Sequence, residues 1–358
     1  MNPRAHRLEV YEVVGETAEA VSLVFEIPAG LVSRFEYTPG QFLTVRVPSA
    51  RTGSVARCYS LSSSPHCDDR LAVTIKRTPL GYASNWLCDN VTAGSLLTVL
   101  EPAGNFSPRA WNRDLLLCAA GSGITPVMSI LKSALARGRG KITLVYANRD
   151  RASIIFARQL QQLVQRYPRR LTVLHWLESE RGAPTAPGLA TWMRPYRTWD
   201  IYLCGPPGFT LVAKRGLAQL RVSERVIRQE EYRSLTDNPF EPPTPASPIA
   251  TGTLAPTAPP GVAGAAGDAT VRVEIDGATH TLPWPRGKKL LDVLLDHGID
   301  APYVCRESAC GTCVCRVARG RTRMLVNECL IDEELEMGLT LACQTLPESD
   351  DLHIAFDQ

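Results

Sequence analysis

Short apolar stretches that alternate with polar residues dominate the first third of the chain. Four of them, at 21–27, 41–47, 71–77 and 96–101, are separated by turn residues. Alternation with a period of two places the apolar side chains on one face of a strand. Strands of this kind in close succession are typical of an antiparallel barrel. The pattern therefore predicts a β-barrel domain over residues 1–112.

From residue 113 the pattern changes to apolar strands that alternate with helical repeats. The expected elements are strand 115–119, helix 125–137, strand 142–146, helix 153–167, strands 171–176 and 201–204, and a helix near 209–220. Such alternation makes a parallel sheet with its ligand site at the carboxyl ends of the strands. Residues 113–236 are therefore predicted to form an α/β domain.

The last part of the chain follows a stretch, 237–269, that is rich in Pro, Ala and Gly and has almost no large apolar residue. Such a segment buries too little surface to offset its ordering entropy, so it is predicted to be a linker.

In 270–358, alternating apolar residues lead to Asp276-Gly277, a hairpin signal, and leucines at helical spacing stop at Gly298. A hairpin, a helix and then a cysteine loop is the order of an α+β domain of the β-grasp type.

The cysteine loop has the spacing Cys305-x₄-Cys310-x₂-Cys313, and Cys343 follows 30 positions later. This is the plant-type ferredoxin spacing, in which four thiolates hold the two irons of a [2Fe–2S] cluster. Gly311 lets the backbone approach the inorganic sulfides. A zinc ribbon would have paired C-x₂-C motifs, and here only one such pair occurs. We therefore predict these four cysteines as the cluster ligands.

Composition and charge exclude several classes of partner and metal site. At 358 residues the chain is long enough for two to three domains, and its net charge of +3 is too small to indicate a nucleic-acid or membrane partner. The remaining seven cysteines show no regular pairing, and no run reaches the ~18 apolar residues of a membrane helix. The six histidines are scattered, without the spacing of a Rieske centre or another metal site. A soluble, cytoplasmic electron carrier without its own oxygen-activating metal is expected.

Candidate flavin residues lie in the barrel half. In Arg57-Cys58-Tyr59-Ser60, the Arg can hold a phosphate, the Tyr lies on the same face to stack on a flat ring, and the Ser can hydrogen-bond the redox edge of that ring. A Gly/Ser turn at 81–85 opens a helix whose amides can receive a pyrophosphate, which favours FAD over FMN. The predicted flavin-binding residues are Arg57, Cys58, Tyr59, Ser60, Val73, Ile75, Lys76, Gly81, Tyr82, Ala83 and Ser84.

Candidate nicotinamide residues lie in the α/β half. The loop 120–126 (AGSGITP) separates a strand from a helix, and 204–209 (CGPPGF) ends the last strand. With the barrel motifs, these pieces resemble the ferredoxin–NADP reductase superfamily. The resemblance implies that the Gly121 loop takes the pyrophosphate and that Cys204 lies near the nicotinamide, with Ser60 and Cys204 as catalytic residues. The predicted nicotinamide-binding residues are Gly121, Ser122, Gly123, Thr125, Pro126, Asn148, Arg149, Asp150, Cys204, Gly205 and Pro206.

Coenzyme choice rests on the turn 148–151 (NRDR). Asp150 can accept hydrogen bonds from the ribose and repels a 2′-phosphate, which favours NADH. Arg149 and Arg151 oppose this, because an arginine beside the ribose can pair with that phosphate. NADH is predicted, with NADPH as the alternative.

The three predicted modules have complementary electron-transfer chemistry. A nicotinamide delivers two electrons together, a [2Fe–2S] cluster accepts one at a time, and a flavin can do both. Several stretches, among them 51–60 (RTGSVARCYS), 171–179 (LTVLHWLES) and 341–350 (LACQTLPESD), resemble the reductase components of actinobacterial 3-ketosteroid 9α-hydroxylases. The resemblance covers essentially the whole chain and implies FAD, NADH and a Rieske-type oxygenase partner.

Two departures from this family stand out, namely the long linker and Tyr232, which replaces a Phe. The alternatives are a reductase of the same layout that serves a phenylacetyl-CoA epoxidase, a fatty-acyl desaturase or an aromatic-ring oxygenase, and a cluster-bearing redox sensor that is not an enzyme. Their specificity would lie in a partner-facing surface, which the motifs do not reveal.

Overall fold

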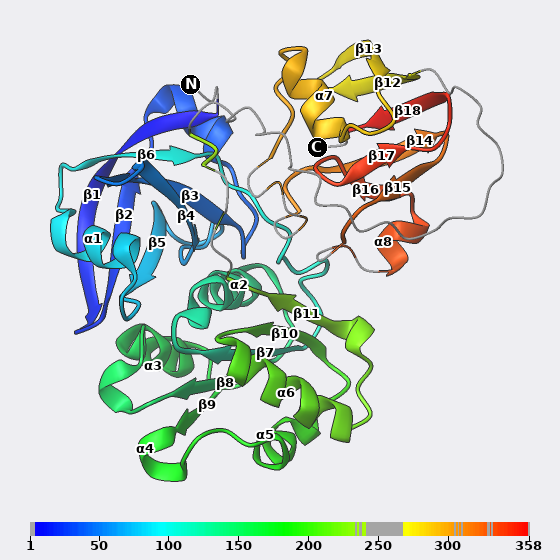
Figure 1. Ribbon diagram of the computed structural model, residues 1–358. Helices are drawn as coiled ribbons and strands as arrows, with labels where there is room; N and C mark the ends of the chain where they lie inside the picture. Colours follow the sequence, from blue (N-terminus) through cyan, green and yellow to red (C-terminus); the bar gives the residue numbers. More distant parts are fainter. Residues whose placement is uncertain are drawn as a thin grey trace, which may run out of the picture. The chain divides into compact units, whose positions relative to one another are not determined.

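The computed structural model describes residues 4–232, 235, 238–240, 268–303, 306, 308, 311–327, 330 and 332–356. The chain divides into two compact units, one from Arg4 to Thr236 and one that includes Asp237–Gln358 (Figure 1). Most of the predicted linker, together with Cys305 and Cys310, lies outside the described residues.

The first part of the Arg4–Thr236 unit is an antiparallel sheet of six strands in the order β4-β3-β6-β1-β2-β5. Its edges meet where Leu61, just after β4, bridges to Val73 in β5, so the sheet closes as predicted. A core of alternating apolar side chains fills the interior, and α1 follows β5 (Figure 1). The elements are β1 (Ala5–Thr17), β2 (Ala20–Glu26), the short 3-10 helix η1 (Ala29–Phe35), β3 (Phe42–Ser49), β4 (Gly53–Ser60), β5 (Leu71–Lys76), α1 (Tyr82–Asn90) and β6 (Leu96–Leu100).

The second part of this unit is a parallel sheet of five strands in the order β11-β10-β7-β8-β9. Alternate residues of the inner strands point to opposite faces, one packed on α2 and α3 and the other on α5 and α6. The elements are β7 (Leu115–Ala120), η2 (Gly121–Gly123), α2 (Ile124–Arg137), β8 (Ile142–Asn148), η3 (Arg151–Ser153), α3 (Ala157–Arg166), β9 (Leu171–Leu177), α4 (Glu178–Arg181), α5 (Ala186–Met193), η4 (Arg194–Tyr196), β10 (Asp200–Cys204), α6 (Pro207–Gln219), η5 (Glu224–Val226) and β11 (Ile227–Glu230).

The C-terminal unit holds a mixed sheet in the order β13-β12-β18-β14-β16 and a separate pair, β15-β17. The turn of the first hairpin is Asp276-Gly277, and both residues have positive φ (49° and 75°), as the predicted hairpin turn requires. The elements are β12 (Ala269–Ile275), β13 (Ala278–Trp284), α7 (Leu290–Asp296), β14 (Val314–Arg319), β15 (Thr322–Met324), α8 (Asp332–Glu336), β16 (Leu339–Leu341), β17 (Thr345–Pro347) and β18 (Asp351–Ala355).

The predicted helix 153–167 is shorter than expected. Asp150 caps a 3-10 turn at Arg151–Ser153, and Phe156 then adopts a left-handed conformation with φ 61°, so α3 begins only at Ala157. The sequence pattern also did not predict β1, α5 or β11. Within the described part of the chain, no helix is long and apolar enough to cross a membrane.

Candidate functional site

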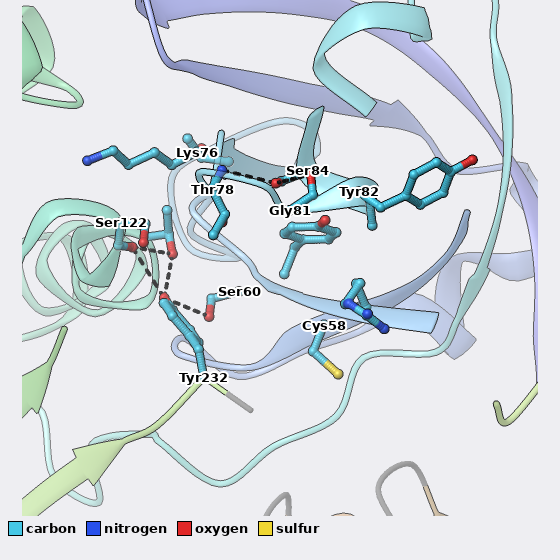
Figure 2. A pocket seen from close by; sticks show the side chains of 14 residues that line it. Cys58, Ser60, Lys76, Thr78, Gly81, Tyr82, Ser84, Ser122 and Tyr232 are labelled. Carbon is cyan, nitrogen blue, oxygen red and sulfur yellow. Dashed lines mark hydrogen bonds between the residues drawn. The ribbon is translucent and has the colours of Figure 1, made fainter. Parts of the chain in front are cut away.

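A cavity of about 400 Å³ opens where the barrel meets the parallel-sheet lobe (Figure 2). It is built from the end of β4, the outward side of β5, the loop into α1, the start of α2 and the residue pair after β11. Its lining residues are Arg57, Cys58, Tyr59, Ser60, Thr74, Lys76, Thr78, Gly81, Tyr82, Ala83, Ser84, Ser122, Thr125 and Tyr232. The site thus joins nine residues predicted for the flavin with two predicted for the nicotinamide.

The lining fits a flavin diphosphate. Its charged members, Arg57 and Lys76, are both cationic. Helix α1 starts after Gly81 without an acidic residue in its first turn, so its amides favour an anion. A Cβ on Gly81 would lie 2.8 Å from the Thr78 Cβ, so a larger residue at this position would clash with Thr78. The Ser84 hydroxyl accepts a hydrogen bond from the Thr78 amide (3.1 Å), which fixes the loop.

Tyr232 links the two lobes at this cavity. Its hydroxyl accepts a hydrogen bond from Ser60 of the barrel (3.3 Å) and lies 2.9 Å from Thr125 Oγ1 of α2. It also donates to the Ser122 carbonyl at 3.2 Å, and Figure 2 shows these contacts converging on one atom. The phenol therefore occupies the space between the predicted flavin residue and the predicted nicotinamide loop.

The two predicted nucleotide loops pack backbone against backbone. A Cβ on Gly123 would lie 2.2 Å from the Cys204 carbonyl oxygen, and one on Gly205 would lie 3.1 Å from the Ala120 Cβ. Gly121 has φ +53°, a conformation that favours glycine. Small residues are thus needed here for the two loops to approach.

Burial controls the protonation of the polar groups at this junction. Cys204 is fully buried at the end of β10, and burial raises the pKa of its thiol far above the usual range, so it stays neutral. Glu230 pairs with Cys204 across β10 and β11. Burial, and then the charge of Glu231, raise the Glu230 pKa to about 8, so this carboxyl is mostly protonated at pH 7.

Other predicted residues lie away from the cavity. Val73 and Ile75 are fully buried in the barrel core, so their side chains cannot reach the cavity, and Pro126 is buried in α2. Asn148 is buried at the end of β8, and neither polar atom of its side-chain amide has a hydrogen-bond partner within the described residues. Pro206 caps α6 on the second nucleotide loop.

Both arginines of the predicted coenzyme turn form ion pairs with carboxylates of other segments. Arg149 pairs with Glu19 of the β1–β2 turn at 2.5 Å, and Arg151 pairs with Glu180 at 2.9 Å. Asp150 accepts the Ser153 amide through Oδ1, and this hydrogen bond lowers the pKa of its carboxyl. None of these three residues lines the described cavity.

The C-terminal unit contains two of the predicted cluster cysteines in its described part. Cys313 and Cys343 are almost fully buried, at 2% and 1% exposure, and the Ala342 amide donates to the Cys313 carbonyl at 3.0 Å. Arg306, Ser308 and Gly311 all have positive φ (59°, 66° and 68°). Left-handed residues that alternate with right-handed ones can direct backbone amides toward an anion, and such loops occur at iron–sulfur sites. The donor set present fits a cluster.

Three lining residues were not predicted, namely Thr74, Thr78 and Tyr232. The signal for Thr74 was present, because Val73 and Ile75 face the core and the residue between them must face outward. Tyr232 stands out in the sequence as a departure from the family, but no motif assigns it a role, because its place in the cavity depends on the packing of β11 beside β10.

Comparisons with known proteins cover all three modules. Families described as an oxidoreductase FAD-binding domain, an oxidoreductase NAD-binding domain and a 2Fe-2S iron-sulfur cluster binding domain match residues 8–107, 117–215 and 273–348. The fold is that of a phthalate dioxygenase reductase structure, with a TM-score of 0.55 at 20% identity over 98% of both chains.

The chain is 51% identical over 357 residues to a Mycobacterium tuberculosis protein named "3-ketosteroid-9-alpha-monooxygenase, ferredoxin reductase component", covering 98% of this chain and 96% of the relative. Its identity to one component of the 1,2-phenylacetyl-CoA epoxidase of Escherichia coli is 29%, over 98% of each chain. Because the higher identity extends over essentially the whole chain, the protein belongs to the family of ferredoxin reductase components of 3-ketosteroid-9-alpha-monooxygenases, with FAD-, NAD- and [2Fe–2S]-binding domains.

Proposed function

We propose that this protein passes electrons from NADH through FAD and its [2Fe–2S] cluster to a Rieske-type oxygenase that hydroxylates 3-ketosteroids at C9, in the cytoplasm. The observation that supports this most strongly is the 51% identity to a named reductase of that system over the full chain, against 29% to the epoxidase component. We assign residues 1–112 to the flavin domain, 113–236 to the nicotinamide domain, 237–269 to the linker and 270–358 to the ferredoxin domain.

Bound FAD supplies the exchange between a hydride and single electrons. Around it, we assign Arg57 and the first turn of α1 to the diphosphate, and Tyr59 to the ring face. Ser60, whose hydroxyl donates to Tyr232 in this structure, would instead donate toward the redox edge of the bound ring. The loops at Gly121 and Cys204 hold the nicotinamide nucleotide, and the neutral Cys204 thiol adds no charge at the hydride path. Cys305, Cys310, Cys313 and Cys343 hold the cluster.

Reconstitution tests this function. The holoprotein, NADH and a purified 3-ketosteroid oxygenase should together yield the 9α-hydroxylated steroid, and NADH consumption should match product formation. The same reductase added to a phenylacetyl-CoA epoxidase should give little product. Efficient epoxidation without steroid hydroxylation would favour the alternative acceptor. Failure to oxidise NADH with either acceptor would reject the enzyme assignment.

Coenzyme preference follows from the two ion pairs of the turn after β8. Because Glu19 and Glu180 neutralise Arg149 and Arg151, we expect kcat/KM for NADH to exceed that for NADPH by about tenfold, or ~1.4 kcal/mol. Glu19→Ala releases Arg149 and should shift the ratio toward NADPH. The pairs are exposed, so their loss costs little stability. Glu180→Ala provides the parallel test on Arg151, and an NADPH preference in the unaltered protein would contradict this assignment.

The hydroxyl of Tyr232 should set nicotinamide access. A nicotinamide ring that reaches the flavin must compete with a phenol held by Ser60, Thr125 and the Ser122 carbonyl. Tyr232→Phe removes these three hydrogen bonds, each worth ~1 kcal/mol net and ~3 kcal/mol together, so the Kd of NAD⁺ should fall by roughly 100-fold. Titration of the flavin absorbance with NAD⁺ measures this, and Thr125→Val, which removes one partner, should give a smaller change in the same direction. An unchanged Kd in Tyr232→Phe would show that the phenol does not compete.

A further inference from the structure

A chain of buried hydroxyl groups lies behind the cavity. Ser22 in β2 and Thr74 in β5 are cross-strand partners on the outward face of the sheet, and their hydroxyl oxygens are 2.7 Å apart. Ser62 extends this chain from Thr74 at 2.8 Å, and Ser22 donates to the Glu16 carboxylate at 2.7 Å. The three hydroxyl residues are only 3–5% exposed. Four side chains thus form one continuous hydrogen-bonded series.

The series connects the cavity with a partly exposed carboxylate. Thr74 lines the cavity together with Ser60 and Lys76. Glu16, at the other end, is partly exposed at the end of β1. The series therefore leads from the proposed flavin site to a carboxylate that solvent can reach.

Its chemistry suits proton transfer. A hydroxyl donates one hydrogen bond and accepts up to two, and the Ser62–Thr74 and Thr74–Ser22 bonds can each be donated from either side. The series can therefore reorient after each transfer. At its outer end, burial raises the pKa of Glu16, while Ser22, the Phe156 amide and the Lys132 ammonium act in the opposite direction. Tyr146 of β8 also interacts with Glu16, and its own pKa is raised far above neutrality.

The proposed reaction releases a proton at the flavin site. Each NADH oxidised yields NAD⁺, two electrons and one proton, and the cluster carries away only the electrons. The proton that arrives with the hydride must leave the flavin site. We propose that Thr74, Ser22 and Glu16 carry this proton from the flavin site to solvent, with the Glu16 carboxylate as the terminal acceptor. This inference rests on the proposed function, because it requires the flavin in this cavity.

A buried hydroxyl pair between the barrel and helix α2 provides a matched control. Ser64 and Ser133 form a hydroxyl pair at 2.7 Å, and both are fully buried. Within the described part of the chain, no hydrogen bond joins this pair to the series. Ser133→Ala therefore removes a similarly buried hydroxyl outside the series without interrupting the route.

The test measures proton release separately from hydride transfer. Holoprotein in weak buffer with a pH indicator is mixed with NADH and ferricyanide, and flavin absorbance and proton release are followed together. Ser22→Ala and Glu16→Gln should slow proton release by at least ~10-fold and leave flavin reduction by NADH unchanged. Neither residue lines the cavity, so neither change should disturb flavin binding.

A second measurement does not depend on turnover. The infrared difference between photoreduced and oxidised holoprotein should contain a carboxyl band that shifts in D₂O, disappears in Glu16→Gln and persists in Ser133→Ala. Wild-type proton release in Glu16→Gln and Ser22→Ala, or equal slowing by Ser133→Ala, would overturn the route. In those outcomes NADH still reduces the flavin. A protein that binds no flavin, or whose flavin NADH cannot reduce, would instead overturn the proposed function.

Discussion

Replacing Cys343 by alanine should abolish reduction of cytochrome c and of the oxygenase while leaving NADH-dependent reduction of ferricyanide intact. Cys343 is 1% exposed and is the proposed fourth ligand of the cluster. Without four thiolates the two irons are not held, so one-electron acceptors that depend on the cluster should be reduced ~100-fold more slowly or worse. The flavin lies in the separate Arg4–Thr236 unit, so its absorbance should not change.

Cys315 provides the matched control, because it is equally buried, at 1%, in the same core. Its position, two residues after Cys313, fits none of the four ligand positions of the plant-type spacing. Cys315→Ala should therefore keep the EPR signal of the reduced cluster and about two irons per chain. If Cys315→Ala lost the signal and Cys343→Ala kept it, the ligand assignment would be wrong.

Local pattern was sufficient for much of this fold. Strands with a clear period of two, such as β5 and β12, and a helix with apolar residues at a spacing of three to four, such as α7, follow from short-range sequence alone. Turns were equally predictable where the backbone conformation favours particular residue types, as at Asp276-Gly277, where both residues have positive φ. Strand β1 was missed because only Leu8 and Val10 of its thirteen residues are buried, which leaves little alternation to detect.

The candidate site was predictable where its chemistry follows a motif. Arg57 to Ser60 and Gly81 to Ser84 occupy consecutive positions, so a short pattern finds them. Tyr232 could not be placed in this way, because it meets Ser60 from 172 positions away. The Glu16–Ser22–Thr74 series joins three strands, and none of its residues belongs to a recognisable motif. Contacts of this kind depend on register between strands, which no local pattern specifies.

The tight contact between the two nucleotide loops leads to the second large effect. Gly123→Ala should reduce kcat/KM for NADH by ~100-fold, because the new Cβ would lie 2.2 Å from the Cys204 carbonyl oxygen and 2.5 Å from its carbon. Both atoms belong to the backbone, so the loops must separate by roughly 1 Å. A displacement of this size between reacting groups lowers the reaction rate by about 100-fold. Gly123 has φ −59°, which alanine adopts without strain, so the loss would be steric in origin.

The neighbouring Gly208 separates this effect from a general intolerance of substitution. It lies in the second nucleotide loop at the start of α6, and a Cβ there would meet nothing within 4 Å. Gly208→Ala should keep wild-type kcat/KM. In Gly123→Ala, flavin content should be retained, because the flavin site is built mainly from β4, β5 and α1, and chemically reduced flavin should still pass electrons to the cluster. If Gly123→Ala turned over NADH as fast as Gly208→Ala, the close approach of the two loops would not be needed for hydride transfer.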